Sequence, residues 1–185
     1  MNQPKNLQPG DVLLYSTPPS GIWNFIGRGI SFFEGLAADP GDNIKYEHAA
    51  IVVDPASDQG FETNPPSAHW IRLSEQPWDR IDVYRPTGLK VDQNKLLGFC
   101  YARLGQPYSY ATIARFLGIG LVGAVSSKAA GWLIRRNEGW HGEVCSTMVD
   151  DALEAATGKD IVPQNGQDNV RPSDLASSQY LTLVA

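Results

Sequence analysis

The sequence contains two cysteines and three histidines, the residue types that thiol chemistry requires. Cys145 stands where a helical pattern begins, in the stretch GEVCSTMVDD. The free N–H groups and the positive dipole end at a helix start stabilise a thiolate, and the same N–H groups can hold an oxyanion during acyl transfer. Free cysteine is also among the residue types most often buried. Cys145 is therefore either a nucleophile or a small core residue.

Helical spacing places the two cysteines differently. The apolar residues on the helix face of Cys145 are Val149, Ala152 and Ala156, and those expected on the opposite, solvated face are Asp150, Asp151 and Glu154. Cys100 lies in the middle of another helical pattern, on an apolar stripe with Leu96, Leu97 and Leu104. We interpret Cys100 as a structural residue of the core.

A thiol nucleophile needs a base, and the base needs an orienting group. His48 opens the apolar strand HAAIVVD, from which it can reach a helix packed on the sheet. His141 lies just before Cys145 and is the rival base, whereas His69 lies in a proline-rich loop and is expected at the surface. Glu62, in the stretch GFET, is the candidate orienting carboxylate, and an ordinary exposed glutamate is the alternative.

The elements that must position these residues are strands in the first half of the chain and helices in the second. The expected strands cover 10–15, 48–54, 60–63, 80–86 and 180–185. The expected helices cover 91–105, 109–118, 121–136 and 145–158, with a single turn at 171–178. The strands carrying His48 and Glu62 are expected to form a hairpin. This order of strands followed by helices is typical of the α+β class.

Length and composition exclude several classes of protein. One domain is the default for 185 residues, and a net charge of -5 gives no basic footprint for nucleic acid. The longest apolar stretch, 116–125, is too short to span a bilayer, although contact with a membrane surface stays open. No secretory signal is visible, so the cytoplasm is the default location; a phage-borne or exported lytic enzyme would look the same.

Five sequence blocks occur in an order that resembles a known family. They are QPGDVLLY, YEHAAIVVD, GFET, LGQPYSY and EVCSTMVDDAL, and they run from residue 8 to about residue 157. The order is similar to that of the circularly permuted NlpC-type papain-like cysteine hydrolases of the YiiX-like kind. In unpermuted members of the family the cysteine helix comes first and the histidine strand follows. Here the strand half precedes the cysteine half.

The resemblance implies a single permuted papain-like domain over residues 1–185. Its fold would be α+β, with a small antiparallel sheet packed against the helix that bears the cysteine and with additional helices. The strand half would cover about 8–90, the helical and cysteine half about 91–160, and a C-terminal strand would lie within about 170–185.

The resemblance also implies roles for individual residues. Cys145 would be the nucleophile and His48 the base. Glu62 would be the third polar residue, where unpermuted members often have histidine, and Tyr108 would help to polarise the scissile carbonyl. Two features depart from the unpermuted pattern: the stretch between Tyr108 and Cys145 is much longer, and Val144 replaces an aspartate. No metal or organic cofactor is required.

The substrate that the resemblance implies is an amide bond in a peptidoglycan stem peptide, cleaved through an acyl-enzyme. An alternative is a lipid acyl hydrolase or acyltransferase of the lecithin:retinol acyltransferase type, in which the apolar stretch 116–125 would line an acyl groove. A further alternative is a non-catalytic binding module on the same fold. A metal site built from the three histidines and Cys145 lacks ligand-pair spacing.

The long segment 16–46 is rich in glycine and proline, and long loops in compact domains usually have a function. Its aromatic residues include Trp23, Phe25, Phe32 and Phe33. We expect this segment to cover or border the cleft of the site.

Overall fold

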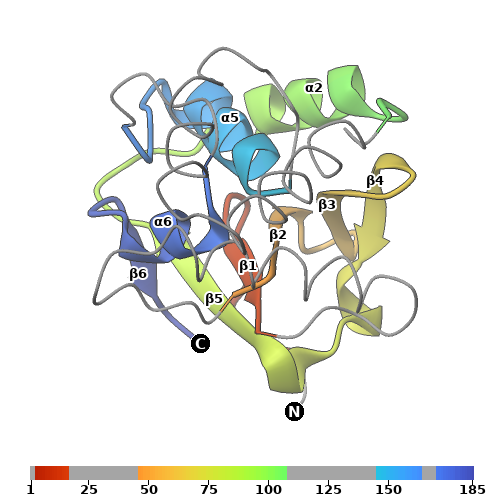
Figure 1. Ribbon diagram of the computed structural model, residues 1–185, viewed down its shortest axis with the longest axis horizontal. Helices are drawn as coiled ribbons and strands as arrows, with labels where there is room; N and C mark the ends of the chain where they lie inside the picture. The colour runs from red at the N-terminus through yellow and green to blue at the C-terminus, as the bar shows by residue number, and fades with distance from the viewer. Residues whose placement is uncertain (1–2, 17–45, 108–144, 164–169) are drawn as a thin grey trace, which may run out of the picture.

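A computed structural model describes residues 3–16, 46–107, 145–163 and 170–185 of the chain. Within these residues, a six-stranded antiparallel sheet has the strand order β4-β3-β2-β1-β5-β6 (Figure 1). The strands are β1 (Val12–Tyr15), β2 (His48–Asp54), β3 (Gln59–Asn64), β4 (Ser67–Arg72), β5 (Ile81–Pro86) and β6 (Leu181–Leu183). The expected strands and the hairpin of β2 with β3 are confirmed.

Helices follow the strands in the chain, as expected for the α+β class. The described helices are α2 (Gln93–Arg103), α5 (Cys145–Thr157) and the short α6 (Pro172–Ser177), with two 3₁₀ turns, η1 (Leu73–Glu75) and η2 (Trp78–Arg80). In Figure 1, α2 and α5 lie side by side across one face of the sheet, and α6 lies beside β6. Asp92 caps α2 by accepting hydrogen bonds from the backbone N–H groups of Asn94 and Lys95.

The sheet is covered on both faces, which explains why β2 is apolar along both of its sides. One face contributes Ile51 and Phe61 to a core shared with α5, where Met148 and Leu153 are fully buried. The other face packs beneath the two 3₁₀ turns, and its buried residues are Leu13, Tyr15, Ala50, Val52, Leu73, Trp78, Ile81 and Val83. Burial of these two clusters provides the main stabilisation of the fold.

Asp11, in the block QPGDVLLY, fixes the position of β1. Its buried carboxylate accepts two hydrogen bonds of 2.7 Å from Arg85 on β5 and one of 2.8 Å from the backbone N–H of Gln8. A paired carboxylate of this kind can be buried because its charge is balanced. The register of β1 in turn sets Tyr15 directly opposite His48 on β2.

Three expectations about single residues are wrong. The stretch containing His69 is strand β4 rather than a loop, because Pro65 and Pro66 form the turn between β3 and β4 and the ladder resumes at Ser67. Asp150 is buried rather than solvated, because the chain after α5 folds back and the N–H of Val162 donates to its carboxylate. Leu104 is 45% exposed, since α2 ends at the preceding residue.

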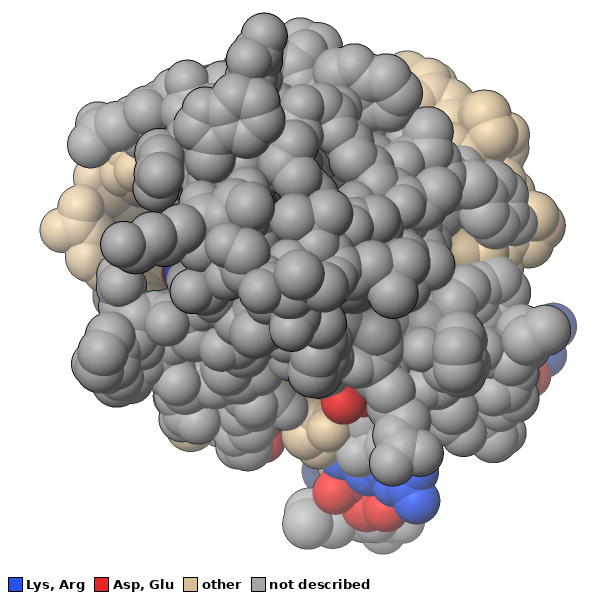
Figure 2. Space-filling view, viewed as in Figure 1, with Lys and Arg blue, Asp and Glu red and all other residues tan. Residues whose placement is uncertain are grey.

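Other expectations fall outside the described residues. They concern the helices at 109–118 and 121–136, the segment 17–45 with its aromatic residues, and the apolar stretch 116–125. None of the described helices is long and apolar enough to cross a membrane. On the face seen in Figure 2, acidic and basic side chains of the described residues lie next to each other at the lower edge, and further charged groups are visible at the right edge.

Candidate functional site

His48 is the first residue of β2 and lies at the end of the strand, against Tyr15 of β1. The two ring centroids are 5.1 Å apart and the planes are tilted by 50°. The Tyr15 hydroxyl donates a hydrogen bond of 2.9 Å to Oε1 of Gln76, which fixes the phenol ring. The phenol ring of Tyr15 therefore packs against the imidazole of His48 in a fixed position.

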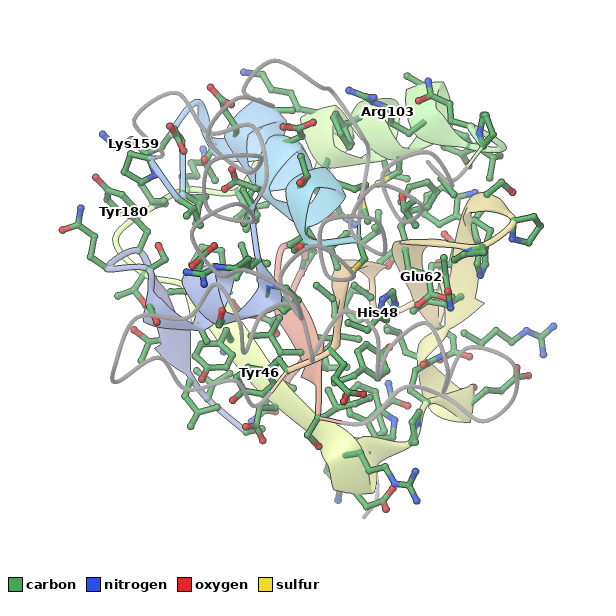
Figure 3. All side chains as sticks on the ribbon, viewed as in Figure 1. Tyr46, His48, Glu62, Arg103, Lys159 and Tyr180 are labelled. Carbon is green, nitrogen blue, oxygen red and sulfur yellow. The ribbon has the colours of Figure 1, made fainter. Side chains whose placement is uncertain are left out.

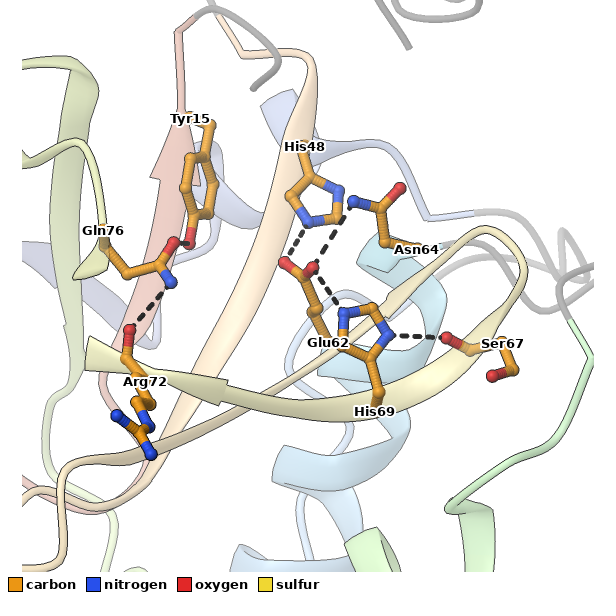
Figure 4. Close-up of polar contacts among 8 residues, drawn as sticks. All are labelled: Tyr15, His48, Glu62, Asn64, Ser67, His69, Arg72 and Gln76. Carbon is orange, nitrogen blue, oxygen red and sulfur yellow. Dashed lines mark hydrogen bonds and ion pairs between the residues drawn. The ribbon is translucent and has the colours of Figure 1, made fainter. Parts of the chain in front are cut away.

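Glu62 on β3 is the hydrogen-bond partner of His48. Nε2 of His48 lies 2.8 Å from Oε2 of Glu62, and each side chain is 9% exposed (Figures 3 and 4). The hairpin of β2 and β3 brings the two residues together on the same face of the sheet. The expected pairing of His48 with a carboxylate on the next strand is thus present in the structure.

Cys145 is the first residue of α5 and is 5% exposed. Cys145 also acts on His48, since its charge and a side-chain hydrogen bond are among the causes that raise the pKa of His48. Because Nε2 of His48 faces Glu62, Nδ1 is the nitrogen left for the thiol. His48 on β2 is thus bonded to Glu62 on β3 and interacts electrostatically with Cys145 on α5, three residues far apart in the sequence.

The charges of this group stabilise one another. Burial alone lowers the pKa of His48, but the charges and hydrogen bonds of Cys145 and Glu62 outweigh burial and raise the pKa to about 10. Burial raises the pKa of the Glu62 carboxyl, but the charge and hydrogen bond of His48, with a smaller contribution from His69, bring it well below its ordinary value. At neutral pH His48 is therefore an imidazolium held against the carboxylate of Glu62.

His69 on β4 is a site residue that sequence reasoning missed. It lies directly opposite Glu62 in the ladder of β3 and β4, and its Nε2 is 3.1 Å from Oε1 of Glu62. Asn64 also reaches Oε1, with Nδ2 at 3.4 Å. The available signal was the alternation in SAHWIR, which was hidden by the two prolines before it. Tyr15 was also missed, since only the strand register places it beside His48.

The other candidates are placed differently. Tyr108 and His141 lie outside the described residues. Cys100 is fully buried in the middle of α2, and burial raises its pKa to about 12, as expected for a structural thiol. Both cysteines are free thiols. Within the described part of the chain, no group of three or more His, Cys, Asp or Glu side chains is arranged to hold a metal ion.

Comparison of the chain with protein-family models, with curated proteins and with solved structures returned no match. The chemistry of the site is therefore inferred from its own geometry and from the sequence blocks described above.

Proposed function

We propose that this protein is a thiol-dependent hydrolase that cleaves an amide bond through an acyl-enzyme on Cys145. The single observation that carries the proposal is the buried pair of His48 and Glu62, 2.8 Å apart, whose histidine also has its pKa raised by Cys145. A nucleophile, a base and a group that orients the base are the three parts that covalent acyl transfer requires. Cys100 has none of these partners among the described residues and serves as an internal reference.

The proposed reaction begins with the thiolate of Cys145 and the imidazolium of His48. The sulfur attacks the carbonyl carbon, a C–S bond forms and the carbonyl oxygen becomes an oxyanion. The backbone N–H of Cys145, at the start of α5, stabilises that charge, with Tyr108 as a second donor by resemblance. His48 gives its Nδ1 proton to the leaving amine, and the C–N bond breaks to leave a thioester.

Hydrolysis of the thioester reverses these roles. Neutral His48 takes a proton from water, the resulting hydroxide attacks the thioester carbon, and the acid product leaves as Cys145 returns to the thiolate. Glu62 holds the imidazole by Nε2, so that Nδ1 faces the sulfur in both steps. Tyr15 limits rotation of the ring by packing against it.

The fold class is compatible with a permuted papain-like domain. The strand that carries His48 precedes the helix that carries Cys145, which is the rotated order of the NlpC-type family. The segment before Tyr108 also pairs with the sheet, since Pro107 forms a bridge with Ser67 and the N–H of Ala68 donates to the carbonyl of Gln106 at 2.9 Å. Tyr108 thus follows a residue that is anchored at β4, and this supports its proposed role.

The proposed substrate is an amide bond in a peptidoglycan stem peptide, which is the substrate class that the family resemblance implies. The test is hydrolysis of purified muropeptides by the wild-type protein, with Cys145→Ala, His48→Ala and Cys100→Ala as matched variants. We expect new amine and carboxyl products from the wild type and from Cys100→Ala. We expect no product from Cys145→Ala or from His48→Ala.

Two outcomes would change the proposal. Turnover of lipid acyl esters but not of muropeptides would replace the amide substrate with the acyl ester of the lecithin:retinol acyltransferase type. Full activity in both Cys145→Ala and His48→Ala would overturn the site itself.

A further inference from the structure

The carboxylate of Glu62 is held by two imidazoles, one on each oxygen. His48 bonds Oε2 and His69 bonds Oε1, so that the carboxylate lies between the rings (Figure 4). The second ring is itself fixed, because Nδ1 of His69 lies 2.7 Å from the backbone carbonyl oxygen of Ser67. His69 has no part in the proposed reaction, so its contact with Glu62 needs a separate explanation.

The partners of His69 determine its protonation state. A carbonyl oxygen can only accept a hydrogen bond, so Nδ1 must carry a hydrogen. The Glu62 carboxylate already accepts from His48, so Nε2 must carry a hydrogen to bond Oε1. His69 can make both contacts only as the imidazolium. Its hydrogen bond to Glu62 is also the main cause that raises the pKa of His69.

His69 differs from the buried pair in its exposure. Its side chain is 41% exposed, compared with 9% for His48 and for Glu62. The imidazole of His69 can therefore exchange protons with solvent, whereas the proton between His48 and Glu62 is shielded from it. Solvent pH can act on the buried pair through the charge of His69.

The ionisable groups that act on His69 come from the neighbouring strands. Within the described residues they are Glu62 on β3 and His48 on β2, while Cys145 on α5 acts through His48. The segment 105–107, which pairs with β4, contributes no ionisable side chain. With His69 protonated, the charges of the carboxylate, the two imidazolium rings and the thiolate of the proposed reaction cancel. Without that proton the site carries an excess negative charge, which disfavours the thiolate.

We infer that His69 is a positioning residue of the proposed site, which holds the Glu62 carboxylate against His48 and keeps the thiolate state of Cys145 populated. This inference rests on the proposed function and deepens it. The inference predicts that the charge of His69 changes the reactivity of Cys145. The two residues stand at opposite ends of the series Cys145, His48, Glu62 and His69, so the effect passes through Glu62.

The test measures alkylation of Cys145 by iodoacetamide between pH 4.5 and 9 in the native protein, with labelled peptides quantified by mass spectrometry. His69→Gln keeps a donor for Glu62 without the charge, and His69→Arg keeps both. We expect His69→Gln to move the acid limb of the alkylation profile upward by about half to one pH unit, because a cation near the site is lost. His69→Arg is expected to follow the wild type.

Arg72→Gln is the matched control, because it also removes a cation from β4 but from an exposed side chain that pairs with Glu75. Its profile should coincide with that of the wild type. A second comparison repeats His69→Gln in a Glu62→Gln background, where the shift should vanish because the group that links the two ends is neutral. Circular dichroism of each variant confirms that the fold is retained.

The outcomes separate the inference from the proposed function. If wild-type Cys145 shows no selective alkylation, the proposed function fails. If wild-type Cys145 is selective but His69→Gln coincides with it, the inference about His69 fails alone. A shift that persists unchanged in the Glu62→Gln background would also overturn the positioning role, since His69 would then act through space and not through Glu62.

Discussion

The two cysteines of this protein are both buried free thiols on helices, yet their surroundings are opposite. Cys100 is 0% exposed in the middle of α2, within the apolar cluster between the helices and the sheet. Cys145 is 5% exposed at the first position of α5, where it acts on His48, whose pKa is raised. Burial is nearly the same at the two positions, so burial does not separate a structural cysteine from a reactive one.

The difference lies in what replaces water around each sulfur. At Cys100 the water is replaced by apolar atoms, which penalise the thiolate and raise the pKa to about 12. At Cys145 the sulfur instead has His48, a cation at neutral pH, as a neighbour, and we propose that this cation favours the thiolate. The same residue type therefore serves as core at one position and as proposed nucleophile at the other.

Exchange of each cysteine for alanine gives the largest expected contrast. We expect Cys145→Ala to lower the turnover of muropeptides by at least about 10⁴-fold, because no other group forms the acyl-enzyme. Cys100→Ala should keep turnover within about twofold, because the change is confined to the apolar core of α2. Steady-state rates measure both. Loss of activity in Cys100→Ala but not in Cys145→Ala would reverse the assignment of the two thiols.

Removal of the imidazole should make Cys145 behave more like an ordinary thiol. In His48→Ala, we expect the alkylation rate of Cys145 at pH 6 to fall about 10²-fold, because an unassisted thiol is almost fully protonated there. The rate of Cys100, measured on its own peptide, should not change and serves as the control. An unchanged rate at Cys145 would mean that His48 does not activate it.

Neutralising Glu62 tests how much the polar surroundings of Cys145 contribute to the stability of the protein. Glu62→Gln keeps the shape of the side chain but leaves His48 without its buried counter-charge, and we expect a loss of about 3 kcal/mol in the free energy of unfolding. Urea denaturation at pH 6 measures this loss. The surroundings of Cys100 are unaffected, so a Cys100→Ala, Glu62→Gln double variant should show additive losses.

The loss in Glu62→Gln should depend on pH in a defined direction. The pKa of His48 is raised from 6.5 to about 10, so its contribution is complete below pH 6.5 and disappears as the pH rises toward 10. The pKa of Glu62 is lowered from 4.5, so its contribution is complete above pH 4.5 and is lost below that value. The stability difference between wild type and variant should therefore be greatest between pH 4.5 and 6.5. A difference that grows above pH 8 would contradict this ion pair.

The smallest expected effect concerns the apolar surroundings of Cys100. Cys100→Ser places a hydroxyl among apolar side chains, and we expect a loss of about 1–2 kcal/mol with no change in turnover. Cys100→Ala is the matched variant without a polar atom, and it should be less destabilised than Cys100→Ser. Equal stability of Cys100→Ser and wild type would show that this position is not as apolar as its burial indicates.

Local patterns predicted the elements that carry the candidate site. The turn stretch PASDQ between the apolar run after His48 and GFET predicted a hairpin, and helical spacing after Cys145 predicted α5 and its buried face. These signals are local, because a strand or a helix buries residues at its own period. The α+β class and the meeting of His48 with Glu62 followed from them.

Contacts that depend on strand register, or on a later segment that folds back over an earlier one, could not be predicted from the sequence. His69 meets Glu62 only because β4 pairs with β3 in one particular register, and the prolines before it suggested a loop. Tyr15 reaches His48 across a long separation in sequence. Asp150 lies at a helix position that is normally solvated, and the segment after α5 buries it and, with the charge of Asp160, raises its pKa to about 7.

The central claim is that Cys145 is activated by His48 and Glu62 whereas Cys100 is not. The most direct test is alkylation of the native wild-type protein with iodoacetamide at pH 6, with both cysteine peptides quantified in the same sample. We predict that Cys145 is labelled at least about 10²-fold faster than Cys100, because a thiolate reacts and a buried neutral thiol does not. Labelling of Cys145 no faster than Cys100 would contradict the account.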